Sequence, residues 1–189
     1  EGVGSVNLRV RPSKCSVHGG IAAQCATLAT DIDVQHCPDG VVVVGVPVGS
    51  ESFKTAHLAH RADAVVRLVN TLTALPLAAQ SQWLILRSSL AWRMAHLERT
   101  VDWDLLSTST RRVERAILAA AAAIFRFPPA TPPEPPDAPL ALSLELRQLS
   151  LALRHGGFGL RATSELQAAA AYLCGAAAAQ LVMDSGPPT

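Results

Sequence analysis

Two groups of residues in this chain have side chains or spacing suited to ligand chemistry. Cys15, His18, His36 and Cys37 carry the thiolate and imidazole groups that hold Zn²⁺, although neighbours such as His36 and Cys37 are difficult to place on one tetrahedral ion. The segment Gly156-Gly-Phe-Gly-Leu160 has the glycine content of a loop that binds phosphate through its backbone amides. These segments are the candidates for a metal site and for a phosphate site.

Both candidates compete with an ordinary structural explanation. The first three cysteines are separated by ten and twelve residues, which fits neither paired CxxC ligands nor a disulfide scaffold. We therefore expect no metal site and reduced cysteines, as in an intracellular protein of either the nucleus or the cytoplasm. The glycine-rich segment follows no strong strand and lacks both a GxGxxG motif and a P-loop lysine, which favours a packing turn. The sequence also contains no HExxH motif and no ordered catalytic triad, so it shows no complete active site.

Arginines form a third group, at the expected start of a helix. Ser107 or Ser109 can cap its N-terminus, and Arg111, Arg112 and Arg115 follow in its first turns. Positive charges at this end oppose the helix macrodipole, so their placement suggests an anionic partner. The alternative is a solvated surface on which a nearby glutamate offsets the charge. Because the formal net charge is only +1, any basic surface must be local.

The elements that must position these residues begin with a strand and a tight turn. Val41 to Val44 are β-branched and favour a pleated, buried backbone, and Gly45, Pro47 and Gly49 then impose special dihedral angles. The pattern predicts a β-hairpin in which Gly45 and Gly49 have positive φ or lie where a side chain would collide. Upstream, the alternation of Val6 to Val10 predicts a further short strand.

Helical periodicity follows the hairpin for most of the remaining chain. From Ser52 the apolar residues recur at three- and four-residue spacing, which predicts a helix of about six turns that Pro76 ends. A second helix is expected from about Leu77 to Arg99 and a third up to Phe125. The sequence therefore predicts a mainly α fold, a helical bundle with a small N-terminal β-hairpin region.

Composition divides the chain into four segments. We expect a β-containing segment at 1–50, a helical bundle at 51–127, an extended linker at 128–139 and further helices at 140–189. Seven of the twelve linker residues are prolines, which excludes a helix or a central strand there. The longest apolar runs are shorter than the roughly 20 residues needed to cross a bilayer, so we expect no membrane segment.

Three segments, in order, resemble the end of the reverse transcriptase domain of non-LTR retroelements. They are Leu8-Arg-Val-Arg-Pro-Ser-Lys-Cys-Ser-Val17, Val42-Val-Val-Gly-Val-Pro-Val-Gly-Ser50 and Leu153-Arg-His-Gly-Gly-Phe-Gly-Leu-Arg161. In that family a strand carrying the motif D lysine of the palm follows the catalytic YxDD or FADD turn, and Lys14 occupies the matching place. A lysine there is thought to act as an acid toward the pyrophosphate leaving group, a role that a tunable ammonium group can fill.

The resemblance also assigns roles to the hairpin and the helices. The hairpin is similar to the primer grip, whose backbone would touch the primer 3′ end. The helices from Ser52 onward would form the thumb, which packs against the primer–template duplex. The glycine-rich turn is similar to a G-G-L-G-L signature near the end of many such domains. The residues implied to contact nucleic acid are Gly45, Val46, Pro47, Gly49, Arg87, Arg93, Arg111, Arg112 and Arg115.

The family's catalytic acids are the main departure. No YxDD or FADD lies upstream of Lys14, and the nearby Asp31 and Asp33 come after it. Two-metal polymerase chemistry needs two aspartates to hold Mg²⁺. Because the chain also begins at Glu1 rather than Met, we expect a piece of a longer protein, whose Mg²⁺ ligands either lie upstream or have been lost by decay of a mobile element. No cofactor is expected in this chain, and the chain alone should be inactive.

Two hypotheses about function follow. The leading one is a fragment of an RNA-directed DNA polymerase that grips primer–template duplex without carrying the catalytic aspartates. The alternative is an alanine-rich helical protein-interaction module without nucleic-acid activity. Convergence of the five arginines on one concave face near Val46 would favour nucleic acid, whereas their dispersal would favour the interaction module.

Overall fold

The computed structural model describes residues 15–19, 22–31, 34–127, 144–160, 170, 172–177 and 180. The chain divides into two compact units, Glu1–Lys54 and Thr55–Thr189. Lys14, the strand expected at Val6 to Val10, the proline-rich linker at 128–139 and most of the last predicted helix lie outside the described residues.

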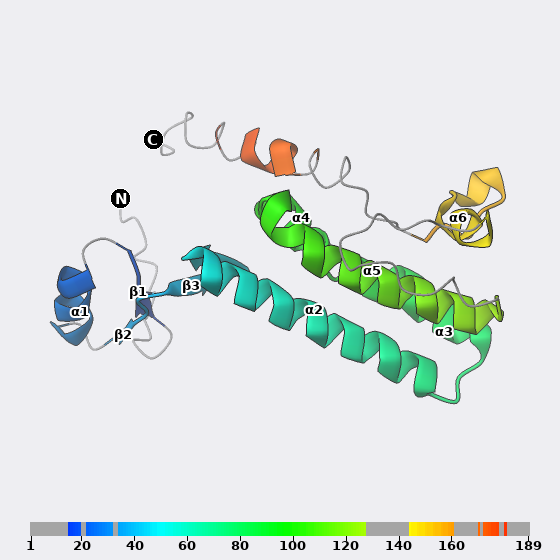
Figure 1. Cartoon of the computed structure of the whole chain (residues 1–189), viewed down its shortest axis with the longest axis horizontal. Helices are drawn as coiled ribbons and strands as arrows, with labels where there is room; N and C mark the ends of the chain where they lie inside the picture. Colours follow the sequence, from blue (N-terminus) through cyan, green and yellow to red (C-terminus); the bar gives the residue numbers. More distant parts are fainter. Residues whose placement is uncertain are drawn as a thin grey trace, which may run out of the picture. The chain divides into compact units, whose positions relative to one another are not determined.

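The first unit contains two small two-stranded sheets. Its elements are β1 (Ser16–Val17), α1 (Ala22–Asp31), β2 (Gln35–His36), β3 (Gly40–Val43) and β4 (Val46–Gly49) (Figure 1). The strands β1 and β2 pair in parallel, with α1 as the connection between them. The strands β3 and β4 pair antiparallel, so the predicted hairpin is confirmed.

The hairpin turn is as short as an antiparallel pair allows. Val43 pairs with Val46, which leaves only Val44 and Gly45 in the loop. Their φ angles are 51° and 82°. Positive φ at both central residues is the pattern of a type I′ turn, whose twist matches that of the flanking strands.

The second unit is helical. Its elements are α2 (Glu51–Ala74, which begins in the first unit), α3 (Ala79–Ser88), η2 (Leu90–Trp92), α4 (Ala95–Thr100), α5 (Trp103–Phe125), α6 (Leu144–Ser150) and η3 (Leu153–His155). The fold is therefore mainly α with a small β region near the N-terminus, as the sequence predicts. Helix α2 ends two residues before Pro76, also as predicted.

Two of the predicted helix boundaries are wrong. The expected second helix is divided into α3, η2 and α4, and α3 ends at Ser88, whose hydroxyl donates to the Leu84 carbonyl at 2.5 Å. Serine hydroxyls compete with the backbone for such bonds and weaken the helix. The third helix begins at Trp103 instead of after Ser107 or Ser109, because Asp102 caps it and accepts from the Asp104 amide at 3.1 Å.

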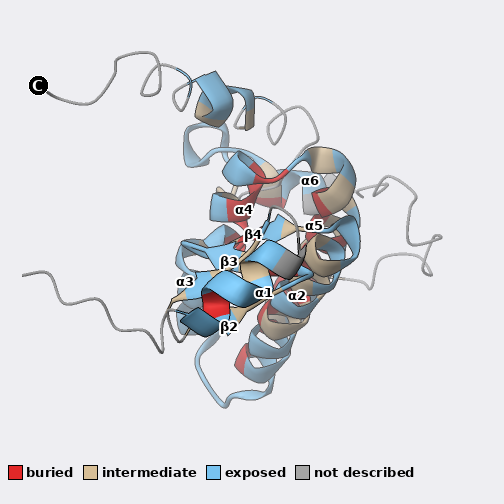
Figure 2. Cartoon of the chain, turned by 90° about the vertical axis from the view of Figure 1, so that its left-hand side faces the viewer, coloured by how far each residue is buried: buried red, intermediate tan, exposed pale blue. Residues whose placement is uncertain are grey.

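The core of the helical unit lies between α2, α3, α4 and α5 (Figure 2). Buried residues of α2 recur at three- and four-residue spacing: Leu58, Ala62, Val65, Val69 and Leu72. The buried residues of α5 include Leu106, Val113, Ile117 and Ala121. Small alanines among them allow close helix approach. None of the described helices is long and apolar enough to span a membrane.

Candidate nucleic-acid interface

The hairpin glycines lie where the sequence predicts strained or crowded backbone. Gly45 has φ of 82° and Gly49 has φ of 147°. A Cβ on Gly49 would collide with the carbonyl oxygen of Asp39, and one on Gly40 would collide with the ring of Phe53. The geometric part of the prediction is confirmed. The crowding at Gly49 and Gly40 comes from the chain itself, so contact with a primer is not needed to explain those two glycines.

The four residues implied to form the primer grip differ in accessibility. Pro47 is buried, Val46 and Gly49 are half-buried, and Gly45 is exposed at the turn. Val44, next to it, is 86% exposed and has the left-handed backbone that β-branched residues rarely adopt. The Val44–Gly45 turn is therefore the most accessible part of the hairpin.

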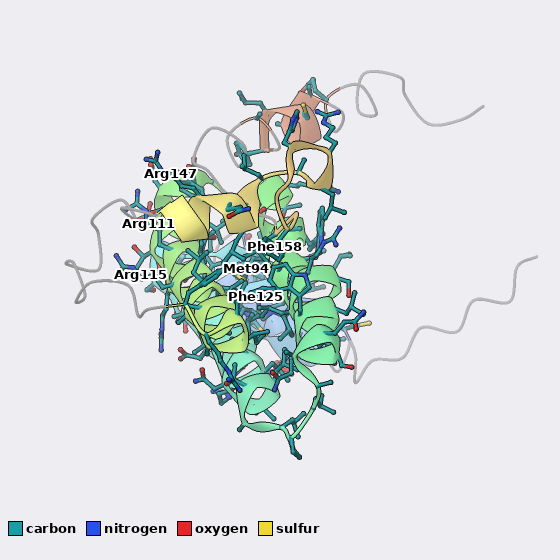
Figure 3. All side chains as sticks on the ribbon, turned by 90° about the vertical axis from the view of Figure 1, so that its right-hand side faces the viewer. Met94, Arg111, Arg115, Phe125, Arg147 and Phe158 are labelled. Atoms are coloured by element: carbon teal, nitrogen blue, oxygen red, sulfur yellow. The ribbon has the colours of Figure 1, made fainter. Side chains whose placement is uncertain are left out.

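Helix α5 brings together two of the five predicted arginines. Arg111 and Arg115 are four residues apart, one helical turn, and both are half-buried. Figure 3 shows their side chains on the same side of the helical unit. They occupy the third and fourth turns of α5, because the helix begins at Trp103. The macrodipole acts only within the first turn, so the expected conflict with the dipole is absent.

Internal contacts do not distinguish the other three predicted arginines from this pair, because Arg111 and Arg115 also have interactions within the chain. Nη1 of Arg112 lies 2.6 Å from Oδ1 of Asp63 on α2, which ties α5 to α2. The guanidinium of Arg87 covers Gly159, since a Cβ there would lie 3.3 Å from Nη2. Arg93 is exposed at the end of η2. All five belong to the helical unit and the hairpin belongs to the first unit.

The glycine-rich segment is a packing turn, as the sequence favours. The amides of Gly157, Phe158, Gly159 and Leu160 donate to the carbonyls of Ala152, Gln148, Leu151 and Leu149, respectively. Because these amides are engaged within the chain, they are not available to cradle a phosphate. The Phe158 ring completes an aromatic cluster, with ring centroids 4.7 Å from Phe125 and 6.0 Å from Trp83.

The cysteines and histidines of the first unit do not converge. The register pairs Ser16 with Gln35 and Val17 with His36, and side chains alternate between the two faces of a strand. If the alternation continues for one residue beyond each strand, Cys15 lies on one face and His18 and Cys37 lie on the other. The His18 ring instead bonds to the Cys37 backbone carbonyl at 2.8 Å. Among the described residues, no three His, Cys, Asp or Glu side chains are grouped to hold a metal ion.

One histidine in the helical unit has a shifted pKa. Burial lowers the pKa of His57 on α2, and the charges of Arg61 and His60 lower it further. The neutral imidazole is therefore favoured in the folded protein.

One arginine that the sequence analysis overlooked lies on α6. Arg147 is exposed in the last turn of this short helix, and in Figure 3 it is on the same side of the unit as Arg111 and Arg115. The sequence signal was weak, because Arg147 has no other arginine or lysine among its near neighbours and lies beyond the proline-rich linker.

The chain matches no protein-family model, no curated protein and no solved structure at a significant level.

Proposed function

We propose that this chain grips the backbone of a primer–template duplex as the thumb-side part of a reverse-transcriptase-like, RNA-directed DNA polymerase. The ordered resemblance of its three segments to the non-LTR family suggests this role. The observation that carries it is the arginine pair of α5, Arg111 and Arg115, which project from one side of the helical unit. The parent polymerase would hold Mg²⁺ through aspartates outside this sequence, and Lys14 would serve as its motif D lysine.

The geometry of the pair suits phosphate better than a base edge. Residues four apart are separated by about 6 Å along a helix axis, so the two guanidinium groups can contact neighbouring phosphates of one strand. Each guanidinium is planar and always charged, and it binds phosphate oxygens in a bidentate manner. Contacts of this kind position a duplex without selecting its sequence.

The alternative function is a helical protein-interaction module. Two observations favour it: Arg87 and Arg112 have contacts within the chain, and several large apolar side chains of the helical unit are exposed. These side chains are Leu68, Leu75, Leu77, Leu84, Ile85 and Trp92. A module of this kind would bind nucleic acid no better than other proteins of similar net charge.

A salt titration separates the two functions. Labelled RNA–DNA duplex is titrated with the chain at several salt concentrations, and the logarithm of the association constant is plotted against the logarithm of the salt concentration. With about three to five phosphate contacts the slope should be roughly −3 to −4. The Arg111→Ala, Arg115→Ala double variant should flatten it by about one to two units.

The matched control is Arg67→Ala, which removes one exposed arginine from α2. Its slope should stay close to that of the wild type. Binding that is undetectable at low salt, or that responds to neither salt nor the double variant, would refute the duplex-gripping role and favour the interaction module. The chain should extend no primer in either case, because Lys14 alone cannot position Mg²⁺.

A further inference from the structure

We propose that the exposed side of α3 binds the same side of α3 in a second copy of this chain, with the two helices antiparallel around a two-fold axis. This side of the helix and its flanks, called here the α3 face, consists of six exposed residues: Leu77, Ser81, Leu84, Ile85, Ser88 and Trp92. The inference does not rest on the proposed function, because it uses neither the hairpin nor the arginines.

The α3 face is one continuous side of the helix. Each residue turns a helix by about 100°, so the four members within α3 fall in an arc of about 100°: Ser81, Leu84, Ile85 and Ser88. Leu86 is fully buried and Trp83 is half-buried, so the opposite side of α3 faces the core of the helical unit. Leu77 and Trp92 lie just beyond the two ends of α3 and are 42% and 52% exposed.

The α3 face carries no charge. Between Leu77 and Trp92 the only charged residue is Arg87, whose guanidinium covers Gly159. The long helix α2, by contrast, exposes three charged residues: Glu51, Arg61 and Arg67. A surface helix normally presents charged residues to water, and depletion of charge around large apolar side chains is typical of the centre of a protein interface. Two α3 faces can therefore meet without burying a charge.

The order of residues in the α3 face selects a second copy as the partner. The face is symmetric about the midpoint between Leu84 and Ile85. A serine lies three residues from this central pair on each side, and a large apolar residue lies seven residues from it on each side: Ser81 and Ser88, then Leu77 and Trp92. A two-fold interface brings the same patch of both copies together in opposite directions. A face with this symmetry therefore matches itself in an antiparallel pair.

The antiparallel pairing places similar side chains opposite each other. Leu84 of one copy would contact Ile85 of the other, and the reciprocal contact would form with it, so four aliphatic side chains cluster at the two-fold axis. Ser81 would lie opposite Ser88 of the second copy. The Ser88 hydroxyl donates to the Leu84 carbonyl, so it can accept a hydrogen bond from the Ser81 hydroxyl.

The length of α3 sets the strength of the association. The helix has 10 residues, which corresponds to about 15 Å. A pair of such short helices buries less than the roughly 800 Å² per partner of a stable protein interface. We therefore expect a weak dimer whose population depends on the protein concentration.

Sedimentation velocity of the whole chain at increasing concentration measures this association. The weight-average sedimentation coefficient of the wild type should rise with concentration. Leu84→Lys should keep the chain monomeric, because two ammonium groups would enter the apolar centre of the dimer. Leu68→Lys on α2 is the matched control, since Leu68 is 43% exposed and Leu84 is 52% exposed. The control should associate like the wild type, and circular dichroism should show wild-type helix content for both variants.

Two double variants test the antiparallel arrangement. Ser81→Glu with Ser88→Lys places a carboxylate opposite an ammonium group at both ends of the antiparallel pair, so the dimer should persist and should weaken as the salt concentration rises. Ser81→Lys with Ser88→Lys places like charges opposite each other and should abolish the association at low salt. A parallel pair would be disrupted by both double variants, because each residue would then face its own counterpart.

Three results would overturn the inference. They are a wild-type chain that stays monomeric up to its highest soluble concentration, equal association of the Leu84→Lys and Leu68→Lys variants, and loss of association in both double variants. The proposed function is tested separately, because a chain that forms this dimer but binds no duplex refutes only the duplex-gripping role.

Discussion

Two adjacent residues of the hairpin turn share a left-handed backbone but differ in how well they tolerate it. Val44 has φ of 51° and Gly45 has φ of 82°. Glycine adopts this conformation without cost, whereas a β-branched residue is strained there by about 1–2 kcal/mol. The sequence predicted the glycine from the turn pattern. It did not predict the strain at Val44, because the run of four valines indicates strand throughout.

Opposite effects are expected from substituting these two residues. Val44→Asn should stabilise the hairpin by about 1 kcal/mol, because asparagine tolerates the left-handed conformation and precedes glycine in type I′ turns. Val44 is 86% exposed, so little burial is lost. Gly45→Val should destabilise the hairpin by more than about 1 kcal/mol and leave the helix content unchanged. Amide hydrogen exchange of residues 40–49 measures both effects.

The control is Val44→Ala, which keeps most of the left-handed penalty. If Val44→Asn exchanges as fast as Val44→Ala, strain at this residue is not significant. If Gly45→Val keeps its hairpin protection and any duplex binding, the assignment of the turn as a primer grip is wrong.

His57 should make the stability of the helical unit depend on pH. Burial and the neighbouring charges of Arg61 and His60 lower its pKa in the folded state, whereas an unfolded histidine titrates near about 6.5. As the pH falls below that value, the unfolded chain takes up the proton first. As the pH is lowered from the pKa of His57 in the unfolded chain to its pKa in the folded chain, the free energy of unfolding should therefore fall. It should be lowest at pH values below both pKa values.

His57→Gln should reduce this loss of stability. Urea unfolding at about pH 7.5 and pH 5.5 gives the difference for the wild type and the variant. His96→Gln, which removes an exposed histidine of α4, is the control and should leave the difference nearly unchanged. A wild-type chain that is equally stable at both pH values would contradict the lowered pKa of His57.

At the scale of the elements, the sequence predicted what local patterns determine. The run of four valines and the turn glycine indicated β3 and β4, and Pro76 indicated the end of α2. The boundaries of α3 and α5 were missed, because the Ser88 hydroxyl and the Asp102 cap were not distinguished from other polar residues. Because α5 begins at Trp103, Arg111 and Arg115 are not in its first turn, and the helix macrodipole gives no reason to expect an anionic partner there. Only the shared orientation of the two side chains suggests one.

The turn after α6 should depend on one aromatic side chain. Phe158→Ala should destabilise the region by roughly 2 kcal/mol, because contacts with Trp83 and Phe125 are lost and the ring is only partly buried. Faster amide exchange in residues 149–160 would report this change. Leu153→Ala, in the same turn but 60% exposed, should have a much smaller effect. Equal effects of the two variants would show that the aromatic cluster does not hold α6 in place.

At the scale of the molecule, long-range contacts decided which candidate residues come together. Arg112 pairs with Asp63 on α2 and Arg87 covers Gly159; no local pattern could have predicted either partner. Arg111, Arg115 and the overlooked Arg147 lie on one side of the helical unit. The sequence thus predicted the helices, whereas the tertiary partners of these arginines could be found only in the folded chain.

The central claim is that duplex phosphates bind the α5 arginines. The most direct test is the arginine Nε–H NMR spectrum of the chain with and without saturating RNA–DNA duplex at low salt, assigned with single alanine variants. The signals of Arg111 and Arg115 should shift and exchange more slowly with solvent, while that of Arg67 on α2 should stay in place. Unchanged signals from Arg111 and Arg115 with the duplex bound, or equal shifts of all the arginines, would contradict the claim.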